Sequence, residues 1–148
     1  MAKIQIKNQQ KAIQIGLPLI RKTASAILGA LALSKAEVSI LLLDDEGITG
    51  LNEQYLKKKG PTDVISFPMH NGAFPGVQPQ LLGDIAISLE TAQRQAGRRG
   101  VSLHEEVSAL LVHGMLHLIG CDHELSPADS RRMKAQERKV LAKVAESC

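Results

Sequence analysis

The sequence predicts a single-domain α+β fold in which about five helices pack on a four-stranded mixed sheet. Two patterns support this class. Short segments alternate apolar and polar residues, which is typical of half-buried strands, and longer segments carry apolar residues at helical spacing. The chain has 148 residues, enough for one hydrophobic core, and no linker, repeat or low-complexity tract divides it. We therefore expect residues 1–148 to form one domain.

The first half of the chain is expected to contain two strands and two helices. Residues 3–7 alternate as a half-buried strand, and residues 38–43 are apolar enough for a central strand. Pro18 can occupy the first turn of a helix between them, and Asp44 or Asp45 can cap a short helix after the second strand. The expected apolar stripes are Ile20, Ala24, Ile27, Leu28 and Leu31 in the first helix, and Ile48, Leu51 and Tyr55 in the second.

The second half is expected to contain two strands and three helices, which completes the order β-α-β-α-β-β-α-α-α. Residues 64–67 and 83–88 have the strand pattern, and residues 68–81, with three prolines and two glycines, are expected to form a loop. A helix follows from Leu89 and ends near Gly97. The last helix begins at a serine-proline signal, Ser126-Pro127. Its inner stripe is Met133, Glu137, Val140, Leu141 and Val144, and Glu137 is an awkward member.

The composition excludes several classes of protein. Aromatic residues make up only 2%, too few for the stacking platforms of RRM or OB domains. The formal net charge of +3 is compatible with a polyanionic partner. The two cysteines, Cys121 and Cys148, are too few for a disulfide scaffold and are expected to be reduced. Neither a secretory signal nor a membrane span is visible, so we expect a cytoplasmic protein with no membrane association.

Three of the five histidines lie close together, at His113, His117 and His123. Residues 102–119 predict a helix, and on it the first two imidazoles project from one face because they are four residues apart. Gly120 can end this helix, so that the chain swings His123 back toward the other two. Three converging imidazoles are what a divalent ion needs, and we therefore expect a metal site here.

The start of this helix is also marked in the sequence. Ser102 and Glu105 form the pattern of a capping box, in which each side chain accepts a hydrogen bond from the other residue's backbone N–H.

Three protein nitrogens would leave a fourth tetrahedral position open, which marks catalytic rather than structural zinc. A metal ion in such a site lowers the pKa of bound water from about 15.7 toward 7. The thiolate of Cys121 could instead close the site, but its place beside Gly120 makes that ligation strained. Zinc proteases of the H-E-x-x-H class carry a general-base glutamate after the first histidine, where this chain has Gly114.

Other side chains near the motif are candidates for catalysis and substrate binding. Glu106, on the same helical face as His113, could act as the general base, although a solvated carboxylate in the first turn is the simpler interpretation. Asp122 is a second candidate for the base, although it is more simply interpreted as a residue that stabilises the turn or orients a histidine. Lys57, Lys58 and Lys59 form a basic loop that could hold phosphates, with Lys57 also a candidate for catalysis. The same run could equally be a solvated surface loop.

The histidine segment resembles the H-G-x-L-H-L-x-G-x-D-H signature of the YbeY family, which comprises bacterial endoribonucleases and rRNA maturation factors. Residues 61–68, PTDVISFP, resemble a second block of that family, P-T-[DN]-V-[LI]-S-F-P. Residues 82–88, LGDIAIS, resemble a third, L-G-D-I-x-I-S. The blocks occur in the family's order and spacing, so the resemblance covers about residues 38–125.

The resemblance implies one zinc ion held by His113, His117 and His123, and single-strand-specific cleavage of RNA. It implies a role in 16S rRNA 3′-end maturation and ribosome quality control, with rRNA and ribosomal subunits as partners and no small-molecule cofactor. One position departs from the pattern. The family typically has an arginine after the tyrosine of L-N-x-x-Y, and here Tyr55 is followed by Leu56.

A leucine at position 56 cannot neutralise phosphate, so either Lys57 or Lys58 substitutes for the arginine or the nuclease is weakened. This departure motivates a second hypothesis, in which the protein is a ribosome assembly factor whose metal ion only braces the fold. A third hypothesis, a metalloprotease, is disfavoured by Gly114.

Overall fold

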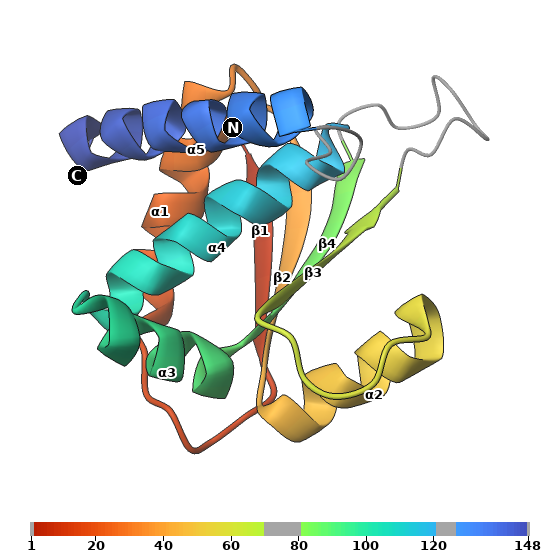
Figure 1. Ribbon diagram of the computed structural model, residues 1–148. Helices are drawn as coiled ribbons and strands as arrows, with labels where there is room; N and C mark the ends of the chain where they lie inside the picture. Colours follow the sequence, from red (N-terminus) through yellow and green to blue (C-terminus); the bar gives the residue numbers. More distant parts are fainter. Residues whose placement is uncertain (1, 70–80, 121–126, 148) are drawn as a thin grey trace.

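Four strands form one mixed sheet in the computed structural model, which describes residues 2–69, 81–120 and 127–147 (Figure 1). The order across the sheet is β1-β2-β4-β3, with β1, β2 and β4 parallel and β3 antiparallel to β4. The strands are β1 (Lys3–Asn8), β2 (Glu37–Leu43), β3 (Val64–Pro68) and β4 (Leu81–Ser88). The predicted four-stranded mixed sheet is confirmed.

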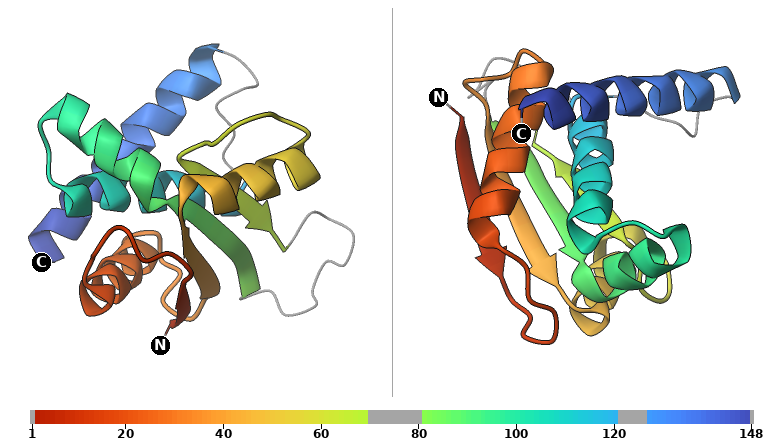
Figure 2. Two further views of the ribbon diagram at one scale, coloured as in Figure 1. Left: turned by 90° about the horizontal axis from the view of Figure 1, so that it is seen from below. Right: turned by 90° about the vertical axis from the view of Figure 1, so that its left-hand side faces the viewer.

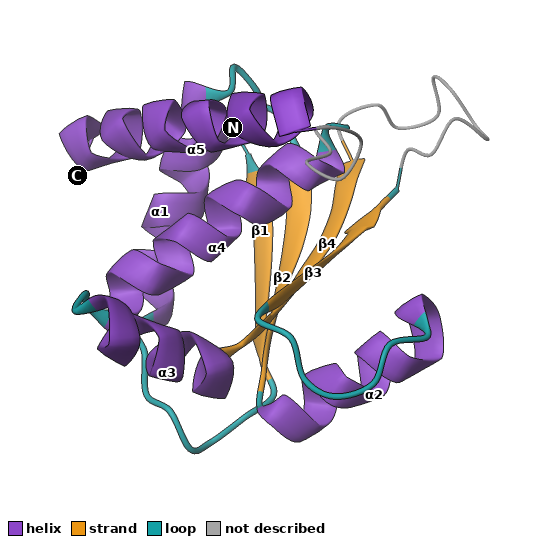
Figure 3. Cartoon of the chain, in the orientation of Figure 1, coloured by secondary structure: helices purple, strands orange, loops and turns teal. Residues whose placement is uncertain are grey.

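Five helices complete the described chain and confirm the predicted element order. They are α1 (Leu17–Ala30), α2 (Asp45–Leu56), α3 (Leu89–Arg99), α4 (Leu103–Leu118) and α5 (Pro127–Ser147). Helices α1, α3, α4 and α5 gather on one face of the sheet, whereas α2 lies on the other (Figure 3). Within the described chain, no helix is long and apolar enough to span a bilayer.

The core is aliphatic throughout the described residues, as the composition predicts. Its main part lies between the sheet and the four-helix layer, where Ile40, Ile85 and Leu116 are essentially inaccessible to solvent. A smaller cluster of Leu43, Ile48, Ile65 and Ala86 lies under α2 on the opposite face. Helix α2 therefore covers only part of that face and leaves neighbouring strand residues open.

Helix α3 is longer than expected: it continues past Gly97 and ends at Arg99. Gly97 is exposed, and a Cβ there would meet nothing within 4 Å, so the glycine neither breaks the helix nor packs against a neighbour. The helix ends at Gly100, which adopts φ +69°. A left-handed residue of this kind is what terminates many helices, and glycine adopts it at little cost.

Helix α4 begins as predicted, with both hydrogen bonds of the Ser102–Glu105 capping box formed. Its middle lies unusually close to the sheet because position 114 is glycine. A Cβ on Gly114 would lie 3.0 Å from Ile85 Cγ2, and Ile85 is fully buried. A side chain at position 114 would therefore require Ile85 or the helix to shift by a few tenths of an ångström. The close packing thus disfavours the glutamate that the H-E-x-x-H arrangement of zinc proteases would place in α4.

Helix α2 is tied to α3 by the carboxylate of Asp45. The hydroxyls of Ser88 and Thr91 donate to Oδ1 at 2.7 and 2.6 Å, and Arg94 Nη2 donates to Oδ2 at 2.8 Å. Partial burial raises the pKa of Asp45, but the hydrogen bonds from Thr91, Ser88 and Arg94, with the charge of Arg94, outweigh it and lower the pKa below 3.8. These bonds fix the first turn of α2.

The substitution Asp45→Asn is expected to lower the free energy of unfolding by about 1–2 kcal/mol near pH 7, because the charged acceptor is lost. A carboxyl whose pKa is lower in the folded state stabilises above its unfolded pKa and loses that effect as pH falls through the folded pKa. The difference between wild type and variant should therefore shrink below about pH 4. Urea unfolding across this range measures it, with the exposed Glu46→Gln as control. A pH-independent difference would contradict the assignment.

Candidate active site

Two imidazoles of α4 face one another at the C-terminal end of the helix. His113 Nε2 and His117 Nε2 lie 3.1 Å apart, and the ring centroids are 4.6 Å apart. Both side chains are half-buried. Two Zn–N bonds of about 2.05 Å at a tetrahedral angle would place the nitrogens about 3.3 Å apart. The spacing of this pair therefore suits two ligands of one tetrahedral ion.

Glu137 fixes the orientation of the first imidazole. Its Oε1 lies 2.5 Å from His113 Nδ1, and because a carboxylate only accepts, the proton on Nδ1 is assigned from this contact. The bond joins α5 to α4 and leaves Nε2 directed at His117. A carboxylate behind a histidine in this way is typical of metal ligands. It also explains why a glutamate occurs in the apolar stripe of α5.

The two histidines open into a cavity of about 390 Å³. Its wall is formed by the C-terminal end of α2, the segment before β3, β3 itself and α4. The lining residues are Asn52, Leu56, Lys58, Thr62, Asp63, Val64, Ile65, Ser66, Pro68, His113 and His117. The second sequence block, residues 61–68, thus contributes most of the wall opposite the histidine pair.

Polar contacts hold this wall in place. Ser66 donates its hydroxyl to the carbonyl of Gly114 at 3.1 Å, which joins β3 to α4 between the two histidines. Asp63 supplies the only carboxylate among the described lining residues, and its oxygens accept from the Val64 N–H and the Gln95 amide. The buried Asn52 donates to the carbonyl of Gly60 at 3.0 Å. The sequence analysis assigned no role to these three residues, although all of them lie in motifs that it identified, L-N-x-x-Y and residues 61–68.

The three lysines of the basic loop have different positions. Lys58 lines the cavity together with the histidines, whereas Lys57 and Lys59 are exposed and do not line it. The backbone of Lys57 is left-handed, with φ +57°, and ends α2. Leu56, which stands where the family typically has arginine, is 44% exposed and also lines the cavity. Of the three lysines of this loop, Lys58 is thus the one that shares the cavity with Leu56.

Glu106 lies away from the cavity. It is 3% exposed, and Arg99 Nη1 of α3 donates to its Oε1 at 2.5 Å. Seven residues on a helix return a side chain to the same face but move it about 10.5 Å along the axis. Glu106 is thus two turns from His113, which makes it unsuitable as the general base. It is also buried and paired, so the simpler interpretation as a solvated carboxylate is wrong as well.

Three predicted residues, His123, Asp122 and Cys121, lie outside the described residues. Across residues 2–69, 81–120 and 127–147, no group of three or more metal-ligating side chains comes together. The convergence of the third histidine therefore stays a prediction.

Together the fold and the site define a small α+β protein with a histidine-centred cavity at the end of a core helix. The model of the family described as Endoribonuclease YbeY matches residues 5–145. The chain belongs to this family, as the sequence motifs suggested.

Relatives named Endoribonuclease YbeY match nearly the whole chain. The protein from Geobacter metallireducens is 45% identical over 141 residues, covering 95% of this chain and 94% of its own. The protein from Aquifex aeolicus is 44% identical over 128 residues, covering 86% and 83%. The solution structure of TM1509 from Thermotoga maritima has the same fold, with a TM-score of 0.67 at 23% identity, covering 99% of this chain and 91% of its own.

Replacing Glu137 tests whether it sets the tautomer of His113. Glu137→Leu removes the acceptor at Nδ1, and the proton of neutral His113 should then shift toward Nε2. Glu137→Gln keeps an acceptor oxygen and should keep the proton on Nδ1. Long-range ¹H–¹⁵N NMR spectra of the imidazoles, recorded on metal-free protein, distinguish the two tautomers. An unchanged His113 spectrum in Glu137→Leu would show that the carboxylate does not orient the ring.

Proposed function

We propose that the protein is a metal-dependent, single-strand-specific endoribonuclease of the cytoplasm. Its substrate would be rRNA in the context of ribosomal subunits, with roles in 16S rRNA 3′-end maturation and ribosome quality control. The observation that carries the proposal is the histidine pair, whose Nε2 atoms lie 3.1 Å apart at the wall of a cavity shared with Lys58. Membership of the YbeY family supports it.

The residues present fit a zinc ion. His113 and His117 would hold it through Nε2, and His123 would supply the third nitrogen. When bound, the ion would supply a Lewis acid for phosphodiester chemistry and a lowered pKa for water. The protein's own contribution is to orient His113 through Glu137 and to bring the Lys58 ammonium close to a phosphate in the cavity.

His113→Ala and His117→Ala are each expected to remove bound zinc and to lower cleavage of single-stranded RNA by at least about 100-fold. His104→Ala is the matched control. His104 lies on the same helix, but its Nε2 contacts the Thr23 hydroxyl at 2.9 Å and it does not line the cavity. Elemental analysis of dialysed protein and cleavage of a labelled RNA, single-stranded or paired, measure both effects. Full cleavage by a metal-free variant would refute the proposal.

A variant at position 56, where leucine replaces the family's arginine, tests whether the protein is a nuclease or an assembly factor with little turnover. Leu56→Arg places a guanidinium at the cavity wall, where it can contact phosphate in a bidentate manner. We expect about tenfold faster cleavage, and a slope of log affinity against log salt that is more negative by about 0.7, as one added phosphate contact predicts. Leu19→Arg is the control, because Leu19 on α1 is also 44% exposed but lies outside the cavity.

No change in rate or salt slope for Leu56→Arg would mean that Lys58 already fills the arginine's role. Wild-type protein that binds RNA and zinc but never turns over would favour the assembly-factor hypothesis.

A further inference from the structure

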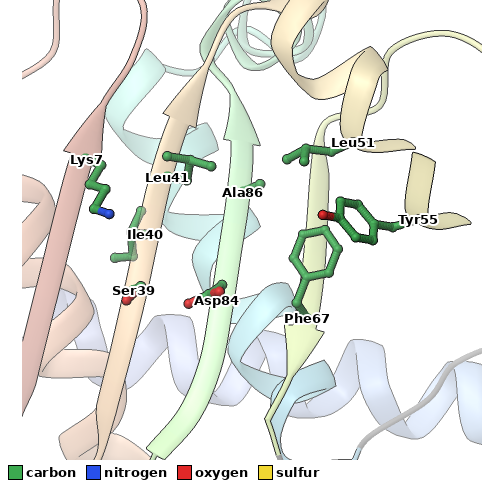
Figure 4. Close-up of a pocket in the computed structure, with 9 residues that line it drawn as sticks. All are labelled: Lys7, Ser39, Ile40, Leu41, Leu51, Tyr55, Phe67, Asp84 and Ala86. Atoms are coloured by element: carbon green, nitrogen blue, oxygen red, sulfur yellow. The ribbon is translucent and has the colours of Figure 1, made fainter. Parts of the chain in front are cut away.

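A second cavity of about 390 Å³ lies on the other face of the sheet, beside α2 (Figure 4). We call it the sheet-face pocket. Its lining residues are Lys7, Ser39, Ile40, Leu41, Leu51, Tyr55, Phe67, Asp84 and Ala86. Helix α2 covers the apolar end of this face and leaves the polar residues of β2 and β4 open. Nothing in the histidine site uses these side chains.

One wall of the sheet-face pocket is aromatic. Tyr55 of α2 and Phe67 of β3 form an edge-to-face pair with ring centroids 5.6 Å apart and an interplanar angle of 78°. Tyr55 is 57% exposed, so much of its ring is open to a ligand. Two of the chain's three aromatic residues therefore meet at one point, which provides stacking surface for one planar group rather than for several.

The floor of the pocket carries a carboxylate at an unusual place. Asp84 lies in the interior of β4, a central strand, where aspartate is disfavoured, and its side chain is exposed on the uncovered face. Within the described residues, it makes no side-chain hydrogen bond or ion pair. In the sheet register its neighbours are Phe67 on β3 and Ser39 on β2. A ring, a carboxylate and a hydroxyl thus lie in one row.

This row is complementary to the Watson–Crick edge of guanine. Guanine is the one RNA base with two adjacent N–H donors, which can both bond to the Asp84 carboxylate while the base stacks on Tyr55. Its neighbouring carbonyl would face Ser39, about 4.8 Å away on the next strand. The Ser39 hydroxyl makes a long, exposed hydrogen bond of 3.5 Å to Gln5 Oε1, and it could donate to the carbonyl instead. Lys7 adds a cation on the same side of the pocket. Adenine, cytosine and uracil each present an acceptor beside their donor, which the carboxylate would repel.

We propose that the sheet-face pocket binds a guanine base, and that in RNA this base lies close to the bond that is cut. The second part rests on the proposed ribonuclease function. The pocket and the histidine cavity share β3 as a wall: Ser66 lines the cavity, and the next residue, Phe67, lines the pocket. Likewise Tyr55 and Leu56 are adjacent in α2 and line different sites. A single strand of RNA passing the edge of β3 could reach both.

The single tyrosine of the chain allows a direct test. Protein labelled with 3-fluorotyrosine gives one ¹⁹F NMR signal, from Tyr55, and this signal is titrated with the 5′-monophosphates of the four ribonucleosides and of inosine. We expect guanosine monophosphate to shift the signal with at least about fivefold higher affinity than the other nucleotides. Asp84→Asn should abolish this preference, whereas Glu53→Gln, an exposed charge change on α2, should retain it.

Other outcomes would overturn the proposal. Equal affinity for all nucleotides would show stacking without recognition of guanine, and no shift with any nucleotide or oligonucleotide would exclude the pocket as a base site. A shift with the free nucleotide but not with a guanine-containing single strand would restrict the pocket to free nucleotides and overturn the RNA part. The titration reads binding alone, so repeating it with His117→Ala separates this proposal from RNA cleavage: guanine preference should persist there.

Discussion

The close approach of α4 to the sheet is the constraint on which the histidine site depends. The backbone of Gly114 packs so closely on Ile85 that a side chain there would force Ile85 or the helix to shift, and the Gly114 carbonyl accepts a hydrogen bond from the Ser66 hydroxyl. These contacts set the depth at which the neighbouring His113 enters the cavity. They also disfavour the glutamate that a zinc protease carries at this position, because its side chain would crowd Ile85. The packing of the core thus selects among chemistries that the histidines alone would allow.

The electrostatic partner of the site comes from a different part of the chain. Glu137 reaches His113 from α5, which packs on α4 and α1, with Met133 and Val140 as buried contacts (Figure 2). Burying part of a carboxylate costs free energy, and the hydrogen bond to the imidazole offsets that cost. The site is therefore built from one helix that supplies the imidazoles and another that orients them.

Much of the fold could be predicted because its signals are local. The capping box at Ser102 and the alternation in β1, β2 and β4 depend on residues only a few positions apart. The end of α3 could not be placed from Gly97, since glycine is tolerated in an exposed helical turn. The periodicity of apolar residues also predicts which face of a helix a side chain lies on, but it does not predict which residues of other elements that side chain contacts. For this reason the sequence places Glu106 on the face of His113, although Glu106 lies two turns from it and pairs with Arg99. The sequence likewise shows Glu137 in an apolar stripe but does not identify His113 as its partner.

Because Glu137 lies on α5, the orientation of His113 depends on the packing of α5 against helices that lie far from the cavity. Helices α1 and α5 are in contact although about a hundred residues separate them in the sequence. Proteins open in cooperative units whose free energies differ, and a terminal helix can detach while a sheet stays folded. Detachment of α5 would free the His113 ring without disturbing the strands. If α5 opened in this way, the fraction of molecules with an ordered site would depend on how strongly α5 packs on α1 and α4 as well as on global folding.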